Sequence, residues 1–451
     1  MIPRLTLTHR FLAAIKSRVA ALVLLFCFAF LAVPGRADTR VIVQVAGGLP
    51  VIQSLCSLLG CSVQYGLGDP LGQVFLIDAP LTLPLSSLAA LPSILDVEID
   101  QTGQAMDATN QGAIPSALYD STAITYYGTT VREGYVLQPA SQIIGIANAQ
   151  SSFHVSGKGI VAVIDTGVDT THPVLQGVLL PGYDFTRNQP GADEKGDLSQ
   201  STTAVIDQST TAVVDQSTTA VVDQSTTAVV DTQAGTALNQ PQYADFGHGT
   251  MVSGVIHLTA PTASILPLKA FQANGTGYLS DVIRAIYYAV GHHAQVLNMS
   301  FNFTSSSLQL YSALSFANLN GVISVAAAGN SGEETLVYPA AYRSLVMGVA
   351  STSNNDTLST FSNYGPNLVW VGAPGEGVVT LYPFATYAAT WGTSFSTPFV
   401  AGAAALLLDM NASCGESQAS QSVAHAKYIN SNLGNGRLDL YQALQAWQIG
   451  Q

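Results

Sequence analysis

Beyond about residue 160, short apolar runs alternate along the chain with longer segments in which apolar residues recur every three or four positions. Short apolar runs are typical of buried strands, and the longer periodic segments are typical of helices that bury one face. Their alternation predicts an α/β domain with a mainly parallel sheet flanked by helices. The predicted strands are Ile160–Ile164, Ser264–Lys269, Val296–Met299, Val322–Ala327 and Leu345–Val349, and the predicted helices are His248–His257, Ser280–Val290, Ser306–Asn318 and Ser394–Met410.

Residues 38–105 have the pattern of a separate, small α+β unit. Three strands and two helices alternate in an order that fits a β-α-β-β-α-β ferredoxin-like plait, of which one strand is not recognisable. The predicted strands are Arg40–Val45, Gln73–Ile77 and Ile94–Ile99, and the predicted helices are Leu49–Leu59 and Leu85–Leu91.

The first 37 residues carry basic side chains but no acidic ones, and they contain an apolar run from Val19 to Val33. Fifteen apolar residues are short for a membrane span, and the small residues of Pro34–Ala37 suit a signal-peptidase site. We expect residues 1–37 to be a signal peptide cut near Ala37, giving a secreted protein, extracellular or periplasmic, with no stable membrane insertion. An uncleaved anchor is the alternative.

Residues 106–140 are polar and rich in tyrosine, without a clear period. We expect them to link the small unit to a main domain at 141–451 and to contain a processing site. Within that domain, residues 200–231 are four tandem octads of the type Gln-Ser-Thr-Thr-Ala-Val-Val-Asp. A dispensable polar surface loop is the simplest interpretation, and a β-ladder or an adhesive arm is the alternative.

Composition excludes some classes of function. The net charge of −13 disfavours nucleic-acid binding. Without the signal, Cys56, Cys61 and Cys414 remain, an odd number that argues against a disulfide framework. Pairing of Cys56 with Cys61 across the Gly60 turn is conceivable, but we expect burial as small apolar side chains. The spacing of Cys and His indicates no metal site, and the adjacent His292 and His293 fit a solvated element end. No cofactor is expected.

Three distant residues suggest nucleophilic catalysis. Asp165 follows a predicted strand, His248 stands between two glycines at a helix start, and Ser394 opens an apolar helix with Pro398 in its first turn. A serine hydroxyl becomes nucleophilic when an imidazole takes its proton, and a carboxylate fixes the tautomer of that imidazole. Each residue alone has an ordinary structural explanation.

The segments Val161–Gly167, Gly247–Thr250 and Gly392–Pro398 together resemble the subtilisin-like serine peptidases, from about Ile143 to Gln442. The resemblance implies a subtilisin-like fold and a catalytic triad of Asp165, His248 and Ser394. It also implies that Asn330, in an Ala-Gly-Asn segment, donates a hydrogen bond to the oxyanion. Residues 38–105 resemble the family's propeptide, a folding template and temporary inhibitor. An unrelated, retained N-terminal domain is the alternative.

The same resemblance implies that the substrate backbone binds between two edges, which would give broad specificity. One edge contains Gly275, Thr276 and Gly277, and the other contains Ser300 and Phe301. The resemblance also implies a cis Tyr338–Pro339 bond.

Three departures from the family concern the first specificity pocket and calcium. Asn302 and Val337 each replace a usual glycine, which predicts a shallow pocket for small or medium apolar side chains. Val174 replaces a common calcium-binding Asp, and the usual calcium loop after Met251 is missing, so we expect no tight calcium site of that kind.

We therefore predict a secreted serine endopeptidase that cleaves proteins or peptides and is made as a zymogen, with its own propeptide as an intramolecular inhibitor. A catalytically silent binding or surface protein of the same fold is the alternative. A third hypothesis makes the octads the functional part and the peptidase fold their carrier.

Overall fold

The computed structural model describes residues 38–105, 113–199, 202, 227–229, 238 and 240–449. The predicted signal peptide lies outside these residues, as does nearly all of the octad insertion. The chain divides into two compact units. Of the described residues, the first unit comprises 38–65 and Phe75–Ile99, and the second comprises Gly66–Val74 and those from Asp100 on.

The small unit is an antiparallel plait with the strand order β2-β3-β1-β4. Its elements follow the predicted β-α-β-β-α-β order, and the apolar faces of strands and helices form one core. The strand missing from the prediction is β2, whose residues are all exposed or only partly buried, so that it lacks the apolar signal of a core strand. The elements are β1 (Asp38–Val45), α2 (Leu49–Leu59), β2 (Ser62–Gly66), β3 (Val74–Pro80), α3 (Leu85–Ala89) and β4 (Ile94–Ile99).

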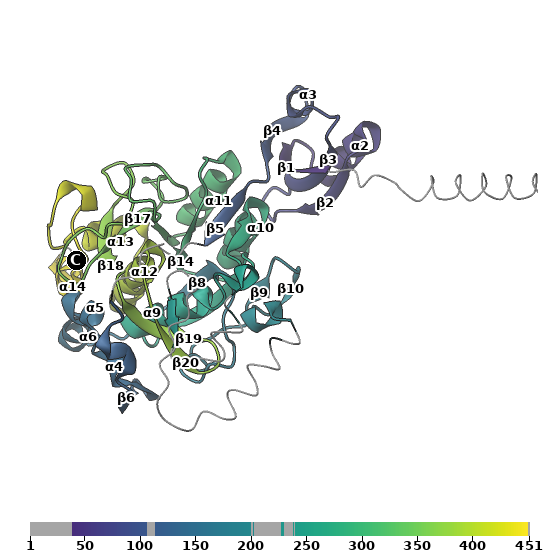
Figure 1. Cartoon of the computed structure of the whole chain (residues 1–451). Helices are drawn as coiled ribbons and strands as arrows, with labels where there is room; N and C mark the ends of the chain where they lie inside the picture. The colour runs from purple at the N-terminus through teal and green to yellow at the C-terminus, as the bar shows by residue number, and fades with distance from the viewer. Residues whose placement is uncertain are drawn as a thin grey trace, which may run out of the picture. The chain divides into compact units, whose positions relative to one another are not determined.

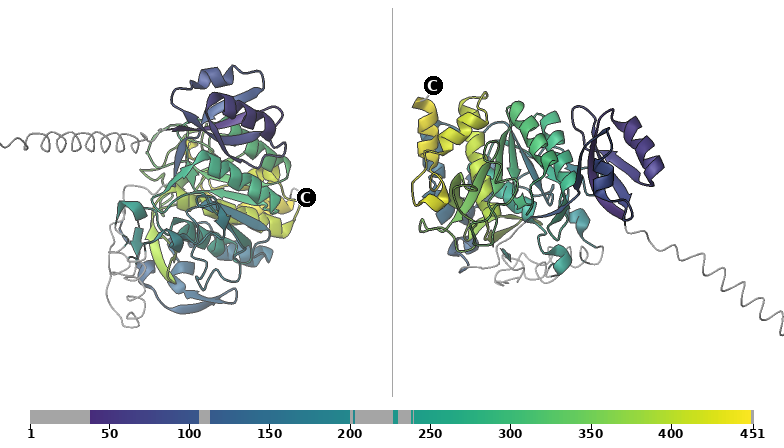
Figure 2. Two further views of the ribbon diagram at one scale, coloured as in Figure 1. Left: turned by 90° about the vertical axis from the view of Figure 1, so that its right-hand side faces the viewer. Right: turned by 90° about the horizontal axis from the view of Figure 1, so that it is seen from above.

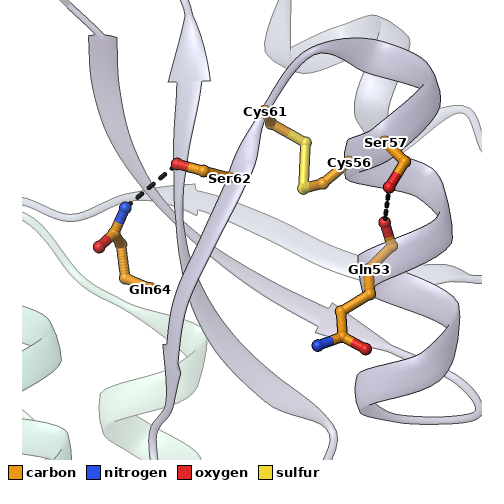
Figure 3. The surroundings of a disulfide bond; sticks show 6 residues. All are labelled: Gln53, Cys56, Ser57, Cys61, Ser62 and Gln64. Carbon is orange, nitrogen blue, oxygen red and sulfur yellow. Dashed lines mark hydrogen bonds between the residues drawn. A yellow bond between two sulfur atoms is a disulfide. The ribbon is translucent and has the colours of Figure 1, made fainter.

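A disulfide joins Cys56 to Cys61 (Figure 3), so the expectation that the two stay unpaired, as small buried apolar side chains, is wrong, although Cys56 is buried. Gly60 ends α2 in the left-handed conformation, at φ 75°, and turns the chain back on itself. The turn brings the two Cα atoms within 4.5 Å of each other, a separation that a disulfide can span. Cys414, the free cysteine of the described residues, is buried.

The large unit is built on an eight-stranded sheet with the order β10-β9-β12-β8-β14-β16-β17-β18. All neighbouring strands from β9 to β18 pair in parallel, and only β10 is antiparallel. The strands are β8 (Ile160–Asp165), β9 (Tyr183–Asp184), β10 (Gln189–Pro190), β12 (Ser264–Lys269), β14 (Val296–Met299), β16 (Ile323–Ala327), β17 (Met347–Thr352) and β18 (Val371–Pro374). The predicted α/β fold with a mainly parallel sheet is confirmed.

Helices cover both faces of this sheet (Figures 1 and 2). On one face α9 packs beside α12, which crosses β14, β16, β17 and β18, and α10 packs with α11 on the other. The helices are α4 (Glu133–Val136), α5 (Pro139–Ile143), α6 (Ile146–Phe153), α9 (His248–Thr259), α10 (Leu279–Gly291), α11 (Leu308–Leu319), α12 (Thr393–Met410), α13 (Glu416–Val423) and α14 (Leu440–Ile449), with 3₁₀ turns at Ser116–Tyr119, Glu194–Asp197, Pro241–Tyr243 and Ser431–Leu433.

Helix α12 is long and apolar enough to cross a membrane, and it is the one such helix among the described residues. Almost all of it is buried inside the protein, where it forms the central core helix. His292 and His293 are exposed at the end of α10, as predicted.

The described part of the predicted linker, from residue 113 on, has structure of its own. A hairpin of β6 (Ala123–Tyr126) and β7 (Thr129–Arg132) is anchored on α9, because the buried hydroxyl of Tyr126 donates to the Leu258 carbonyl oxygen at 2.6 Å. Tyr135 bonds the carbonyl oxygen of Gly254 in the same way, at 2.6 Å. The processing site stays a prediction.

Two short sheets, besides the β6–β7 hairpin and the central sheet, complete the described part of the large unit. Strands β19 (Val378–Tyr382) and β20 (Thr386–Thr390) form a hairpin, and β11 (Thr227–Val229), from the fourth octad, pairs with β20. Strand β5 (Thr102–Ala105) lies between β13 (Thr276–Tyr278) and β15 (Phe301–Asn302).

Candidate active site

Asp165 is the last residue of β8, at the carboxyl edge of the parallel sheet, where ligands of such folds bind. Its side chain is 1% exposed. Oxygen Oδ1 accepts two hydrogen bonds, one from the Thr166 backbone N–H and one involving His248 Nδ1, both at 2.7 Å. The strand therefore fixes the carboxylate, and the carboxylate holds one nitrogen of the imidazole.

His248 is the first residue of α9 and is completely buried. Gly247 precedes it with φ 90°, a conformation that favours glycine. Gly249 allows the helix to approach the end of β8, because a Cβ atom there would lie 1.9 Å from the carbonyl oxygen of Gly167. Both flanking glycines thus permit the approach that joins the histidine to Asp165.

Ser394 lies in the first turn of α12, where backbone N–H groups have no partner within the helix. The side chain of the next residue, Phe395, packs against the imidazole of His248, with ring centroids 5.3 Å apart. The Ser394 hydroxyl donates to the carbonyl oxygen of Ser300 at 3.2 Å, and the Ser300 hydroxyl donates to the carbonyl oxygen of Ser394 at 2.8 Å. These contacts place the first turn of α12 beside His248, and Ser394 itself beside the predicted substrate edge.

Asn330 follows β16 and contacts the same end of α12. Its Oδ1 accepts from the backbone N–H and the hydroxyl of Thr393, at 2.9 and 2.8 Å. These two bonds hold the Asn330 amide at the first residue of α12, one position before Ser394.

The two predicted substrate edges hold a strand of the protein itself. Strand β5 pairs antiparallel with β13, where Gly103 lies opposite Gly277, and antiparallel with β15, where Ala105 lies opposite Phe301. The Ala105 N–H donates to the carbonyl oxygen of Gly275 at 2.8 Å. An extended peptide is therefore accommodated between these edges through main-chain hydrogen bonds.

The two residues that depart from the family at the first specificity pocket are both buried, Asn302 at 7% and Val337 at 6% exposure. A Cβ atom on Gly329, next to Asn330, would lie 3.3 Å from the Asn302 amide nitrogen. Asn302 therefore reaches the oxyanion segment. The Tyr338–Pro339 bond that follows Val337 is cis, as the resemblance implied.

A cluster of buried charges behind the site was missed in the sequence. Lys269 ends β12 opposite Asp165 and is fully buried, and its Nζ donates at 2.7 Å to the carbonyl oxygens of Thr166 and Phe271 and to Asp197. The sequence did contain a signal, because this lysine ends an otherwise apolar strand. A lysine side chain that is buried there needs hydrogen-bond and charge partners.

Within the described residues, no group of three or more His, Cys, Asp or Glu side chains is placed to hold a metal ion. Val174, at the position compared with a calcium-binding Asp, is buried in the hydrophobic core.

The parallel sheet and the residues gathered at its carboxyl edge define a serine peptidase class. The chain belongs to the subtilase family, whose sequence model matches residues 157–442, and it is a serine-type endopeptidase.

Known relatives agree with this family. The chain is 32% identical to thermitase of Thermoactinomyces vulgaris over 297 residues. This alignment covers 63% of this chain and 88% of thermitase. The chain is 36% identical over 249 residues to a thermophilic serine proteinase of Bacillus sp. (strain AK1), covering 55% of this chain and about half, 51%, of that protein. The crystal structure of a lanthipeptide protease matches with a TM-score of 0.53 and 21% identity over 69% of this chain and 96% of that one, a likeness of fold alone.

Proposed function

We propose that this subtilase is a secreted endopeptidase, made as a zymogen, that hydrolyses peptide bonds through Asp165, His248 and Ser394. The observation that carries the proposal is the 2.7 Å contact between Asp165 and His248 at the sheet edge, beside the helix that bears Ser394. A buried carboxylate on Nδ1 keeps the proton there and leaves Nε2 as the base.

In the proposed reaction, the Ser394 oxygen attacks the scissile carbonyl carbon while His248 Nε2 takes the hydroxyl proton. The resulting oxyanion accepts hydrogen bonds from Asn330 Nδ2 and the Ser394 backbone N–H. One such side-chain donor lowers the barrier by about 3 kcal/mol, a magnitude measured in a subtilisin. His248 then gives the proton to the leaving amine, and a water molecule releases the acyl group by the same steps in reverse.

Substrate main chain would bind between the edges that hold β5, with Gly275, Thr276 and Gly277 on one side and Ser300 and Phe301 on the other. The position of residues 102–105 supports a precursor in which the chain blocks its own substrate groove. Removal of this segment by cleavage in the predicted linker would then open the groove. The assignment of residues 38–105 as an inhibitory propeptide, and of residues 1–37 as a signal peptide, belongs to the same proposal.

A serine-directed fluorophosphonate probe tests the proposed activity. Labelling of the mature protein that disappears in Ser394→Ala supports the enzyme, whereas a folded protein that is never labelled would establish the catalytically silent alternative. Mass spectrometry of the mature N-terminus would show the loss of the signal and of the propeptide in one measurement.

We expect deletion of Gln200–Asp231 to leave peptidase activity within about twofold of the intact enzyme, because polar surface loops tolerate large changes of length. Activity towards a small peptide and the melting temperature of the purified deletion variant are the measurements. A folded but inactive variant would assign the octads a role in catalysis, and loss of surface binding with intact hydrolysis would favour the adhesive hypothesis.

The pocket departures predict that small or medium apolar side chains are preferred immediately before the scissile bond. Asn302 and Val337 carry side chains where the family usually has glycine, so less space remains. Profiling cleavage of a peptide library measures this preference. A preference for Phe or Tyr at that position would contradict the prediction, and Val337→Gly should shift the preference towards larger side chains.

Calcium is expected to have little effect on stability. Titration of the metal-depleted enzyme should show no tight binding, and the melting temperature should stay unchanged in millimolar calcium. Tight binding with a raised melting temperature would contradict this expectation.

A further inference from the structure

A buried carboxyl group that the proposed reaction does not use lies behind the candidate dyad. Glu194 begins a 3₁₀ turn and is only 1% exposed. Its Oε2 accepts from the Gly247 backbone N–H at 3.0 Å and from the Thr166 hydroxyl at 3.3 Å, and its Oε1 accepts from the Thr250 hydroxyl. One carboxyl group thus bonds two segments that are distant in sequence, the turn after β8 and the start of α9.

Both threonine hydroxyls extend these bonds further into the backbone. The Thr166 hydroxyl accepts from the Gly249 N–H at 3.0 Å, and the Thr250 hydroxyl accepts from the Asp169 N–H at 2.7 Å. Each hydroxyl therefore accepts on one side and donates to Glu194 on the other. Through direct and relayed bonds, Glu194 holds the residues on both sides of the candidate base.

The backbone around Glu194 lies directly against the same turn. The Glu194 N–H donates to the carbonyl oxygen of Val168 at 3.2 Å, and the Val168 N–H donates to the carbonyl oxygen of Ala192 at 2.9 Å. A Cβ atom on Gly167 would lie 2.6 Å from that Ala192 oxygen and 3.2 Å from the Glu194 Cβ atom. These bonds and close contacts hold the segment Ala192–Glu194, which carries the carboxyl group, against the turn.

Charged groups surround Glu194 on several elements. Burial raises the pKa of Glu194 to about 8, while the Thr250 hydrogen bond and the positive charge of Lys269 oppose the rise and the charges of Asp169 and Asp165 add to it. Lys269 comes from β12, and it also bonds the Thr166 carbonyl oxygen. Glu194 therefore interacts electrostatically with Asp165 and shares hydrogen bonds with the turn that follows β8.

We propose that Glu194 is a positioning residue that fixes the Asp165–His248 hydrogen bond by tying the end of β8 to the first turn of α9. It does not touch substrate. The inference rests on the proposed function, because it assigns Glu194 a part in the same site.

The direct test follows the proton between His248 Nδ1 and Asp165 by its low-field NMR resonance, in protein that carries Ser394→Ala so that it cannot digest itself. Above pH 8, where Glu194 with its raised pKa is ionised, Glu194→Gln should shift, broaden or abolish this resonance, because an amide offers one acceptor oxygen and presents an N–H group to one of the three donors. Glu416→Gln is the matched control: Glu416 is partly buried, and desolvation raises its pKa to about 8 as well, but its carboxylate accepts from the Ser324 N–H instead. The control should leave the resonance in place.

In enzyme with an intact Ser394, Glu194→Gln should lower kcat about tenfold and leave KM within about twofold, since transition-state geometry is lost and not substrate contact. Melting temperatures of all variants confirm that they are folded. An unchanged resonance together with an unchanged kcat in folded Glu194→Gln would overturn the proposal.

If Glu194→Gln does not fold, Thr166→Val is the second variant. It removes only the hydroxyl that relays the bond between the Gly249 N–H and Glu194. A resonance at the original position in this variant would also overturn the proposal. The NMR result does not require turnover. An inactive wild-type protein would therefore refute the proposed function while the resonance still decides the role of Glu194.

Discussion

Ser394→Ala is expected to lower kcat by about 10⁶-fold, the magnitude found when a subtilisin loses its nucleophile. The substitution removes one oxygen atom and leaves the backbone of α12 unchanged, so folding should be retained. The measurement is hydrolysis of a chromogenic peptide, with the active-site concentration of the unmodified enzyme determined by titration. Loss of less than about 100-fold would mean that another group is the nucleophile.

Ser396→Ala is the matched control for this substitution. Ser396 lies two residues further along the same buried helix, and its Oγ atom has no hydrogen-bond partner within the described residues. Removing this hydroxyl should leave kcat unchanged, because no proton acceptor is arranged around it. A similar loss of activity in both variants would point to disruption of α12 and not to nucleophilic catalysis.

Expression of Ser394→Ala as the full precursor extends the same experiment. If the enzyme cleaves its own linker, the variant should accumulate at the size of the uncleaved precursor, whereas Ser396→Ala should mature. Correct processing of purified Ser394→Ala would show that another protease performs the cleavage.

The periodic pattern predicted the elements that are buried on both sides, because a wholly apolar strand has an unambiguous signal. Strands β12 and β14 have the predicted boundaries, and β8 and β16 differ by a residue at one end. Strand β18 was not predicted, since Val371–Pro374 contains a glycine and a proline and has only four residues. Strand β2 of the small unit was not predicted either, because its side chains are exposed or only partly buried and give no apolar pattern.

At the site, the motifs identified the residues that perform chemistry but not those that support them. The approach of α9 to β8 could be anticipated from Gly247 and Gly249, since glycines beside a histidine indicate close backbone contact. The role of Glu194 could not be anticipated in this way. Its partners come from segments that are distant in sequence, and only the fold brings them together. Lone acidic residues in a polar stretch have no periodic or spacing signal that distinguishes a buried one from a solvated one.

Replacement of Asp165 by asparagine separates the charge of this side chain from its shape. Oxygen Oδ1 accepts both hydrogen bonds of the carboxylate, so an amide can retain them with its own oxygen, and the remaining NH2 group would occupy the position of Oδ2. The negative charge that stabilises the imidazolium is lost in either orientation of the amide, and one orientation also reverses the tautomer. We expect kcat to fall by about 10⁴-fold, with KM changed little, in pre-steady-state and steady-state assays.

Asp169→Asn provides the comparison, because it neutralises a second buried carboxylate, four residues further along the chain, in the turn after β8. Burial alone would raise the pKa of Asp169. Hydrogen bonds from Lys195 and Thr171 and the charge of Lys195 outweigh this effect, so the pKa lies below its ordinary value. A lowered pKa means that the folded state favours the ionised form, so this stabilisation is present above the ordinary pKa of Asp and is lost as the pH falls through the folded value. Asp169→Asn should therefore lower the melting temperature at neutral pH, with a difference from the parent protein that shrinks in acid, while kcat falls far less than in Asp165→Asn. If both variants lost kcat equally at a temperature where both are folded, the effect would belong to the charge of the whole cluster, and the specific role of Asp165 behind His248 would be refuted.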